Sequence, residues 1–160
     1  MLFNFNSPTN IYFGQGYFEK TSEITKNIGS NPMIVCGRNS MRKNKFIEKI
    51  SSNFKKAKKK FFIYENISPD AKSNEINDAI TIVKKNKNDF IIGLGGGSAI
   101  DAAKAIAVGT TYSKVEDIIG KTINVSNEHL PIVAIPTTSG TGSEVSKGSI
   151  ITDIKKNFKS

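Results

Sequence analysis

The sequence has little of the chemistry that forms disulfides or binds metals. Its 160 residues contain one cysteine, Cys36, one histidine, His129, and no tryptophan. A single cysteine cannot form a disulfide within the chain, so we expect a reducing compartment, the cytoplasm. A lone loop histidine is more often a surface residue than a metal ligand. We therefore predict no metal site within these 160 residues.

Long apolar stretches are also missing. No run approaches the roughly 18 apolar residues that a membrane-spanning helix needs, and residues 1–6 have neither the basic nor the apolar region of a signal peptide. We expect no membrane partner.

Acidic residues are too few to balance the basic ones, and the net charge is +9. Much of the excess lies in the run 55–60, between a helical pattern and a strand pattern. Such a run is either a solvated helix end or a patch for nucleic acid. We favour the helix end and expect no nucleic-acid partner, because no aromatic residues for base stacking and no nucleic-acid motif accompany it.

What the sequence does have is an alternation of two patterns. Apolar helical spacing predicts helices over 17–28, 46–54, 76–83 and 98–108. Short apolar runs predict strands over 10–13, 33–36, 61–64, 90–94, 132–135 and 149–152. Strands that are apolar on both faces belong to a sheet covered on both sides. We therefore predict one doubly wound α/β domain over residues 1–160, with a mainly parallel sheet and helices on both faces.

A glycine-rich turn separates the strand predicted at 90–94 from the next helix. Gly95, Gly96 and Gly97 let a backbone approach a ligand where a Cβ would collide. Ser98 and Asp101 have the spacing of a capping box, with Ser98 as the helix N-cap. Free N–H groups at such a helix start suit a phosphate; the alternative is a tight turn with no ligand. The pattern is neither G-x-G-x-x-G nor a Walker A loop.

A second turn, 136–145, follows the strand predicted at 132–135 and combines hydroxyls with glycines. Exposed N–H groups, threonines and serines make a polar cradle, and the alternative is a polar surface loop. The carboxyl ends of parallel strands share one edge of a sheet, so both turns open to the same side.

The two turns resemble the signatures of a known family. Residues 95–107 and 136–145, together with 11–16 and 151–153, are similar to the iron-containing (group III) alcohol dehydrogenases. The resemblance implies an NAD(P)-binding domain of the dehydroquinate synthase-like kind. It also implies a C-terminal helical domain, absent from these 160 residues, that holds Fe²⁺ or Zn²⁺ through one aspartate and three histidines.

The resemblance also implies roles for single residues. Gly96, Gly97 and Ser98 would hold the pyrophosphate, and Thr137 and Thr138 would contact the adenosine side. Further candidates implied near the cofactor are Asp70, Asp101, Ser146 and Lys159. Asp70 stands where the family often has asparagine, and its carboxylate adds negative charge near an anionic ligand.

The turn after the strand at 33–36 bears on which nicotinamide nucleotide is used. Members of the family that prefer NAD place an aspartate where Gly37 stands. Without it, Arg38, Ser40 and the Gly37 backbone favour a 2′-phosphate, and so NADP(H) over NAD(H). The alternative is a basic helix start with no special role.

The function that the resemblance implies is hydride transfer between NAD(P)H, with NADPH favoured, and a small primary alcohol or aldehyde, as in butanol and propanediol dehydrogenases. A homodimer is one arrangement it allows for the full-length enzyme. Without metal ligands, we predict that this chain alone is inactive. Two alternatives stay open: a glycerol dehydrogenase-type enzyme of the same superfamily, and a stand-alone, non-catalytic nucleotide-binding module.

Overall fold

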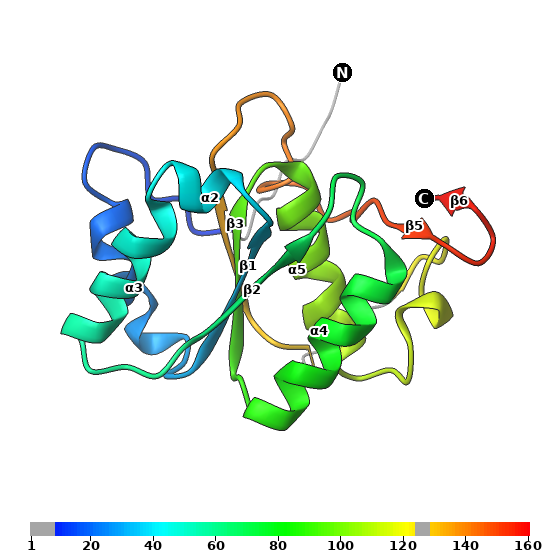
Figure 1. Cartoon of the computed structure of the whole chain (residues 1–160), viewed down its shortest axis with the longest axis horizontal. Coiled ribbons are helices and arrows are strands. Elements are labelled where there is room, and N and C mark those ends of the chain that lie inside the picture. The colour runs from blue at the N-terminus through cyan, green and yellow to red at the C-terminus, as the bar shows by residue number, and fades with distance from the viewer. Residues whose placement is uncertain (1–8, 124–128) are drawn as a thin grey trace, which may run out of the picture.

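The computed structural model describes residues 9–123 and 129–160, and its centre is a four-stranded sheet (Figure 1). The strands lie in the order β2-β1-β3-β4, and every neighbouring pair is parallel. Their bounds are Pro32–Gly37 (β1), Phe62–Ile67 (β2), Phe90–Gly95 (β3) and Ile132–Pro136 (β4). The predicted parallel sheet is confirmed.

Three long helices connect these strands and cover both faces of the sheet (Figure 1). Helix α3, Phe46–Lys56, follows β1 and packs on one face. Helices α4, Ser73–Asn86, and α5, Gly97–Gly109, pack on the other face. The shorter elements are the helices α1 (Thr21–Ile24) and α2 (Ser40–Lys43), the 3₁₀ turns η1 (Phe18–Lys20), η2 (Thr25–Asn27) and η3 (Val115–Asp117), and the strands β5 (Thr152–Asp153) and β6 (Phe158–Lys159). The doubly wound α/β class is confirmed.

The central strand β1 shows why the sequence folds this way. Its side chains alternate between the two faces, as strand geometry requires. Met33 and Val35 are fully buried in the core beneath α4 and α5, whereas Ile34 and Cys36 are fully buried in the core beneath α3. Both faces of β1 are therefore apolar, which produces the continuous run seen in the sequence.

The strand order creates a switch point between β1 and β3. The connection from β1 to β2 runs toward one edge, and the chain then crosses back over β1 to reach β3. Ligands of open α/β sheets bind outside the carboxyl ends of the strands at such a point. The turns after β1 and β3 flank it.

One predicted strand was wrong, and one predicted helix and a second predicted strand differ in form from the prediction. The structure has no strand at 10–13; Phe13 there is 95% exposed, and among the described residues no strand pairs with this segment. The helix expected at 17–28 is divided into η1, α1 and η2. The strand expected at 149–152 is reduced to the short β5, which pairs antiparallel with β6 instead of joining the main sheet.

In the part of the chain that the structure describes, no helix is both long enough and apolar enough to cross a membrane.

Candidate functional site

The turn after β3 depends on two glycines for its shape. A Cβ on Gly93 would lie 2.9 Å from the Cβ of Ala103 and 3.1 Å from the Cα of Ile100. Its absence lets α5 pack directly against β3. Gly95 has a φ of +147°, which disfavours other residues. These two glycines bring the chain sharply from the strand into the helix.

The next two glycines face the second turn. A Cβ on Gly96 would lie 3.2 Å from Thr138 Oγ1, and one on Gly97 would lie 3.2 Å from Ser143 Oγ. The amide of Thr137 also donates to the Gly95 carbonyl at 2.9 Å. The two turns predicted to share one edge of the sheet are therefore in contact, with the glycines of one against the hydroxyls of the other.

The helix start differs from the prediction in one respect. The N-cap is Gly96, in extended conformation, and helix α5 begins at Gly97, so Ser98 is not the cap and forms no capping box with Asp101. The Ser98 hydroxyl instead accepts a hydrogen bond from the Asp70 amide at 3.1 Å. Within residues 9–123 and 129–160, the amides of Gly97 and Ser98 have no acceptor. Free amides at the start of a 13-residue helix fit an anionic group.

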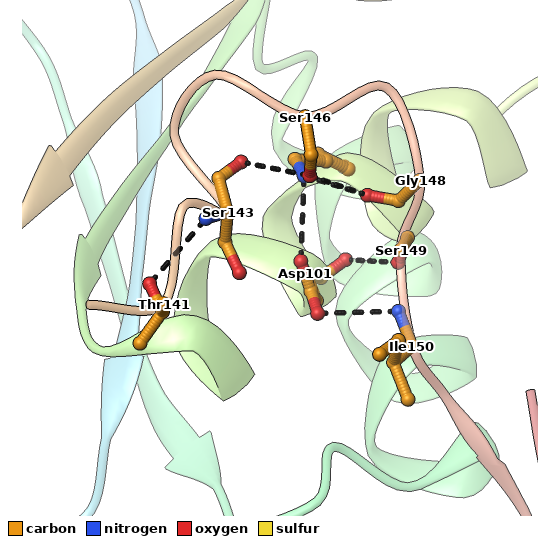
Figure 2. Close-up of polar contacts among 8 residues, drawn as sticks. Asp101, Thr141, Ser143, Ser146, Gly148, Ser149 and Ile150 are labelled. Carbon is orange, nitrogen blue, oxygen red and sulfur yellow. Dashed lines mark hydrogen bonds and ion pairs between the residues drawn. The ribbon is translucent and has the colours of Figure 1, made fainter.

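Asp101 is buried and ties the helix to the chain beyond the second turn (Figure 2). Its Oδ2 accepts from the Ile150 amide at 3.2 Å, and its backbone carbonyl accepts from the Ser149 hydroxyl at 2.7 Å. The residue that the resemblance put near the nicotinamide thus also anchors the segment after the second turn.

Lys104 is a residue of this region that the sequence analysis missed. Its ammonium group donates to Asp101 Oδ1 at 3.4 Å, to Ser146 Oγ at 3.0 Å and to the Gly148 carbonyl at 2.6 Å. Its side chain is only 12% exposed. A lysine on the inner side of a helix, three residues after a buried aspartate, was the available signal. Lys104 joins Asp101 and Ser146, two predicted site residues.

Asp70 and Lys159 are also brought together. The Asp70 carboxylate lies 2.5 Å from the Lys159 ammonium, and both side chains are exposed. Asp70 has a φ of +64°, in the left-handed region that aspartate tolerates better than most residues. The negative charge of Asp70 is thus offset by Lys159, which β6 supplies.

The predicted nicotinamide-discriminating residues lie at the end of β1. Gly37 is the last residue of that strand, whose Cys36 is paired with Leu94 of β3, and Ser40 begins α2 on the surface. Arg38 Nη2 lies 3.1 Å from Glu75 Oε1. This arginine is therefore not a free cation.

Neither the cysteine nor the histidine has a catalytic setting. Burial and the charge of Glu65 raise the pKa of Cys36 to about 12, although Arg42 acts in the opposite direction. The Nδ1 atom of His129 lies 3.0 Å from the carbonyl of Leu130. Within the described ranges, no three histidine, cysteine or acidic side chains are placed to hold a metal ion.

The fold and these turns define a class. An open parallel α/β sheet that carries glycine turns and unpaired helix amides at its switch point has the geometry of a nucleotide-binding domain. The sequence model of the family described as "Iron-containing alcohol dehydrogenase" matches residues 8–160. The chain belongs to this family.

Named relatives agree with this assignment. The chain is 31% identical to NADH-dependent butanol dehydrogenase A of Clostridium acetobutylicum, over 99% of the chain and 41% of that protein. It is also 31% identical to the NADPH-dependent butanol dehydrogenase of Clostridium saccharobutylicum, again over 99% and 41%. The crystal structure of NADH-dependent butanol dehydrogenase A from Thermotoga maritima superposes with a TM-score of 0.89 at 32% identity, over 99% of this chain and 40% of that one. The chain thus spans about two fifths of the length of these relatives.

Proposed function

We propose that this chain is the cofactor-binding domain of a metal-dependent alcohol dehydrogenase that transfers a hydride between NAD(P)H and a small primary alcohol or aldehyde. The observation that carries the proposal is the contact between two polar turns beside the free amides of Gly97 and Ser98. Membership of the iron-containing alcohol dehydrogenase family supports the reaction class. The named substrate of several relatives, butanol, supports a small alcohol.

In this proposal each turn has a separate task. The amides of Gly96, Gly97 and Ser98 bind the pyrophosphate, because a helix N-terminus favours negative charge. Thr137 and Thr138 contact the adenosine side of the nucleotide. The remaining groups, which orient the nicotinamide and its ribose or border them, are Asp70, Asp101, Ser146 and Lys159.

When bound, the nicotinamide supplies or accepts the hydride, and a metal ion polarises the alcohol or carbonyl oxygen. We propose that ligands for Fe²⁺ or Zn²⁺ come from a C-terminal helical domain beyond these 160 residues. The work of this chain is to fix the position of the nucleotide and keep its phosphates paired with donors.

We further propose that NADPH binds more tightly than NADH. Gly37 leaves no carboxylate to repel a 2′-phosphate, while Arg38 and Ser40 offer donors to it. The names of relatives include both NADH- and NADPH-dependent enzymes, so family membership alone leaves the preference open.

A substitution in the cradle tests cofactor binding. Gly97→Val places a side chain where the two turns meet, 3.2 Å from Ser143 Oγ at its first atom. We expect calorimetric titration with NADPH to show at least about a tenfold loss of affinity. The matched control is Gly148→Val, which has open space around its Cβ and an ordinary φ. Equal affinity of the two variants would contradict the proposed cradle.

Activity distinguishes the enzyme from a non-catalytic module. We expect the 160-residue chain alone to show no reduction of butanal by NADPH. Mixed with the separately expressed helical domain of a relative and Fe²⁺, it is expected to gain measurable activity. No activity in that mixture, from a chain that binds NADPH, would favour the stand-alone nucleotide-binding module.

A further inference from the structure

Glu75 is a buried carboxylate beside the turn that follows β1. The residue is 6% exposed and lies in the first turn of α4. Its Oε2 accepts from both the amide and the hydroxyl of Ser68, at 3.0 Å each, and from the Lys72 amide at 3.4 Å. Its Oε1 meets the Nη2 atom of Arg38 at 3.1 Å. One oxygen is thus fixed by the loop after β2, and the other is directed to the arginine.

The two partners are not equally free to move. The Glu75 side chain is 7% exposed, and that of Arg38 is 60% exposed. Glu75 is therefore the fixed member, and Arg38 reaches across from the end of β1 to meet it. A guanidinium group carries five N–H donors, so contact through one amino group leaves others for a second anion.

The other arginine of the chain is also paired with a carboxylate. The sequence has two arginines, Arg38 and Arg42. Arg42 binds Glu65 through both Nε and Nη2, at 2.5 Å each. Both guanidinium groups near the proposed 2′-phosphate site therefore form an ion pair with a carboxylate. A count of basic residues in the sequence does not reveal this pairing.

We infer that Glu75 sets the nicotinamide selectivity of this site by holding Arg38 at its rim and offsetting its charge. The inference rests on the proposed function. Because Arg38 is already paired with Glu75, it attracts a 2′-phosphate less strongly than a free arginine would. Gly37 has no side chain that would exclude the adenine-ribose hydroxyls of NADH. The chain then binds both nucleotides and prefers NADPH only moderately. Glu75 is a positioning residue that acts through Arg38.

The direct test is Glu75→Gln, measured as the ratio of the dissociation constants for NADH and NADPH. The amide oxygen can keep the Ser68 contacts while the negative charge is lost. We expect the ratio to shift toward NADPH by about threefold to fivefold, the range for a partly exposed ion pair. The control, Asp78→Asn, removes a carboxylate from the exposed side of the same helix, and we expect it to leave the ratio unchanged. An unchanged ratio in Glu75→Gln would overturn the inference.

A second measurement needs no change at Glu75. In a ¹⁵N-labelled wild-type chain the arginine side-chain spectrum contains two residues, which an Arg42→Lys variant assigns. We expect slowed rotation about the Cζ–Nε bond of Arg38 in the free chain, because Glu75 restrains it. Free rotation of Arg38 would overturn the inference even if NADPH binds. Failure of the folded wild-type chain to bind either nucleotide would instead overturn the proposed function, and the inference with it.

Discussion

At the scale of single residues, Gly37 gives the sharpest test of cofactor choice. Its φ is ordinary, and a Cβ there would make only a normal contact, 3.5 Å from the Ile67 carbonyl. A carboxylate can therefore be added without strain. We expect Gly37→Asp to weaken NADPH binding relative to NADH by at least about tenfold, since like charges at close range repel.

Titration of Gly37→Asp with each nucleotide measures this change, and Gly148→Asp adds the same charge in open space as a control. A relative weakening of NADPH in both variants would point to net charge and not to the turn after β1. No change in either would contradict the role given to Gly37.

Gly93 and Gly97 are expected to differ in how much a substitution disturbs the packing of α5 on the sheet. Gly93→Ala would press a methyl group against Ala103 and the backbone of Ile100, and overpacking of this kind costs about 1–3 kcal/mol. A Cβ at Gly97 would come closest to the Ser143 hydroxyl, a side-chain end that can move, and would make ordinary contacts with Thr141 at 3.4 and 3.5 Å. We expect urea unfolding to show a lower free energy of unfolding for Gly93→Ala than for Gly97→Ala. The reverse order would show that α5 does not rest on Gly93.

At the scale of elements, Lys104 joins helix α5 to the loop after the second turn. Lys104→Met keeps the unbranched apolar stem of the side chain but removes the ammonium group, and with it the bonds to Ser146 and Gly148 and one partner of Asp101. We expect faster hydrogen exchange at the Ile150 amide and about tenfold weaker nucleotide binding, while the amides of β1 and β3 stay protected. Unchanged exchange at Ile150 would contradict this role.

Asp89 joins the segment before β1 to the start of β3. Burial acts to raise its pKa, but hydrogen bonds from the amides of Ser30 and Asn31 and from the Ser30 hydroxyl outweigh it, so the pKa falls below its ordinary value of 3.8. A lowered folded-state pKa stabilises the fold above the unfolded-state value, and this contribution is lost as the pH falls through the folded-state value.

We therefore expect Asp89→Asn to lower the free energy of unfolding by about 1–3 kcal/mol near pH 7. The difference from wild type should shrink as the pH drops below about 4. Urea unfolding at several pH values measures it. A difference that is constant with pH would show that the charge of Asp89 contributes nothing.

The elements themselves were predictable to different degrees. Helices α3, α4 and α5 and the four parallel strands follow from local apolar spacing, and the structure confirms them. The strand expected at 10–13 was wrong because a strand requires a partner, and pairing is not local in sequence. Ser98 was predicted as the N-cap from its spacing to Asp101, but the extended backbone of Gly96 places the cap two residues earlier.

The candidate site was also predictable only where its features are local in the sequence. Its glycines and hydroxyls could be found from the sequence, because they are contiguous and follow directly after the apolar runs of β3 and β4. The partners of Arg38, Asp70 and Ser146 could not, since Glu75, Lys159 and Lys104 lie 37, 89 and 42 residues away. These contacts arise only when strand ends are brought to a common edge.

At the scale of the whole molecule, the two ends of the sheet differ in their chemistry. The turns after β1, β3 and β4 lie at the carboxyl ends of the strands. A surface pocket lined by Asn31, Lys59, Lys60, Phe61, Phe62 and Asn86 lies where β1 and β2 begin. Part of the positive charge is therefore remote from the proposed nucleotide site and does not bear on cofactor choice.

The central claim is that the edge of the sheet at the β1–β3 switch point binds a nicotinamide nucleotide. Calorimetric titration of the wild-type chain with NADPH and, in parallel, with NADH tests it most directly. We predict saturable binding of both, with NADPH tighter by less than about tenfold because Arg38 is paired with Glu75. Binding of neither nucleotide, by a chain that circular dichroism shows to be folded, would contradict the account.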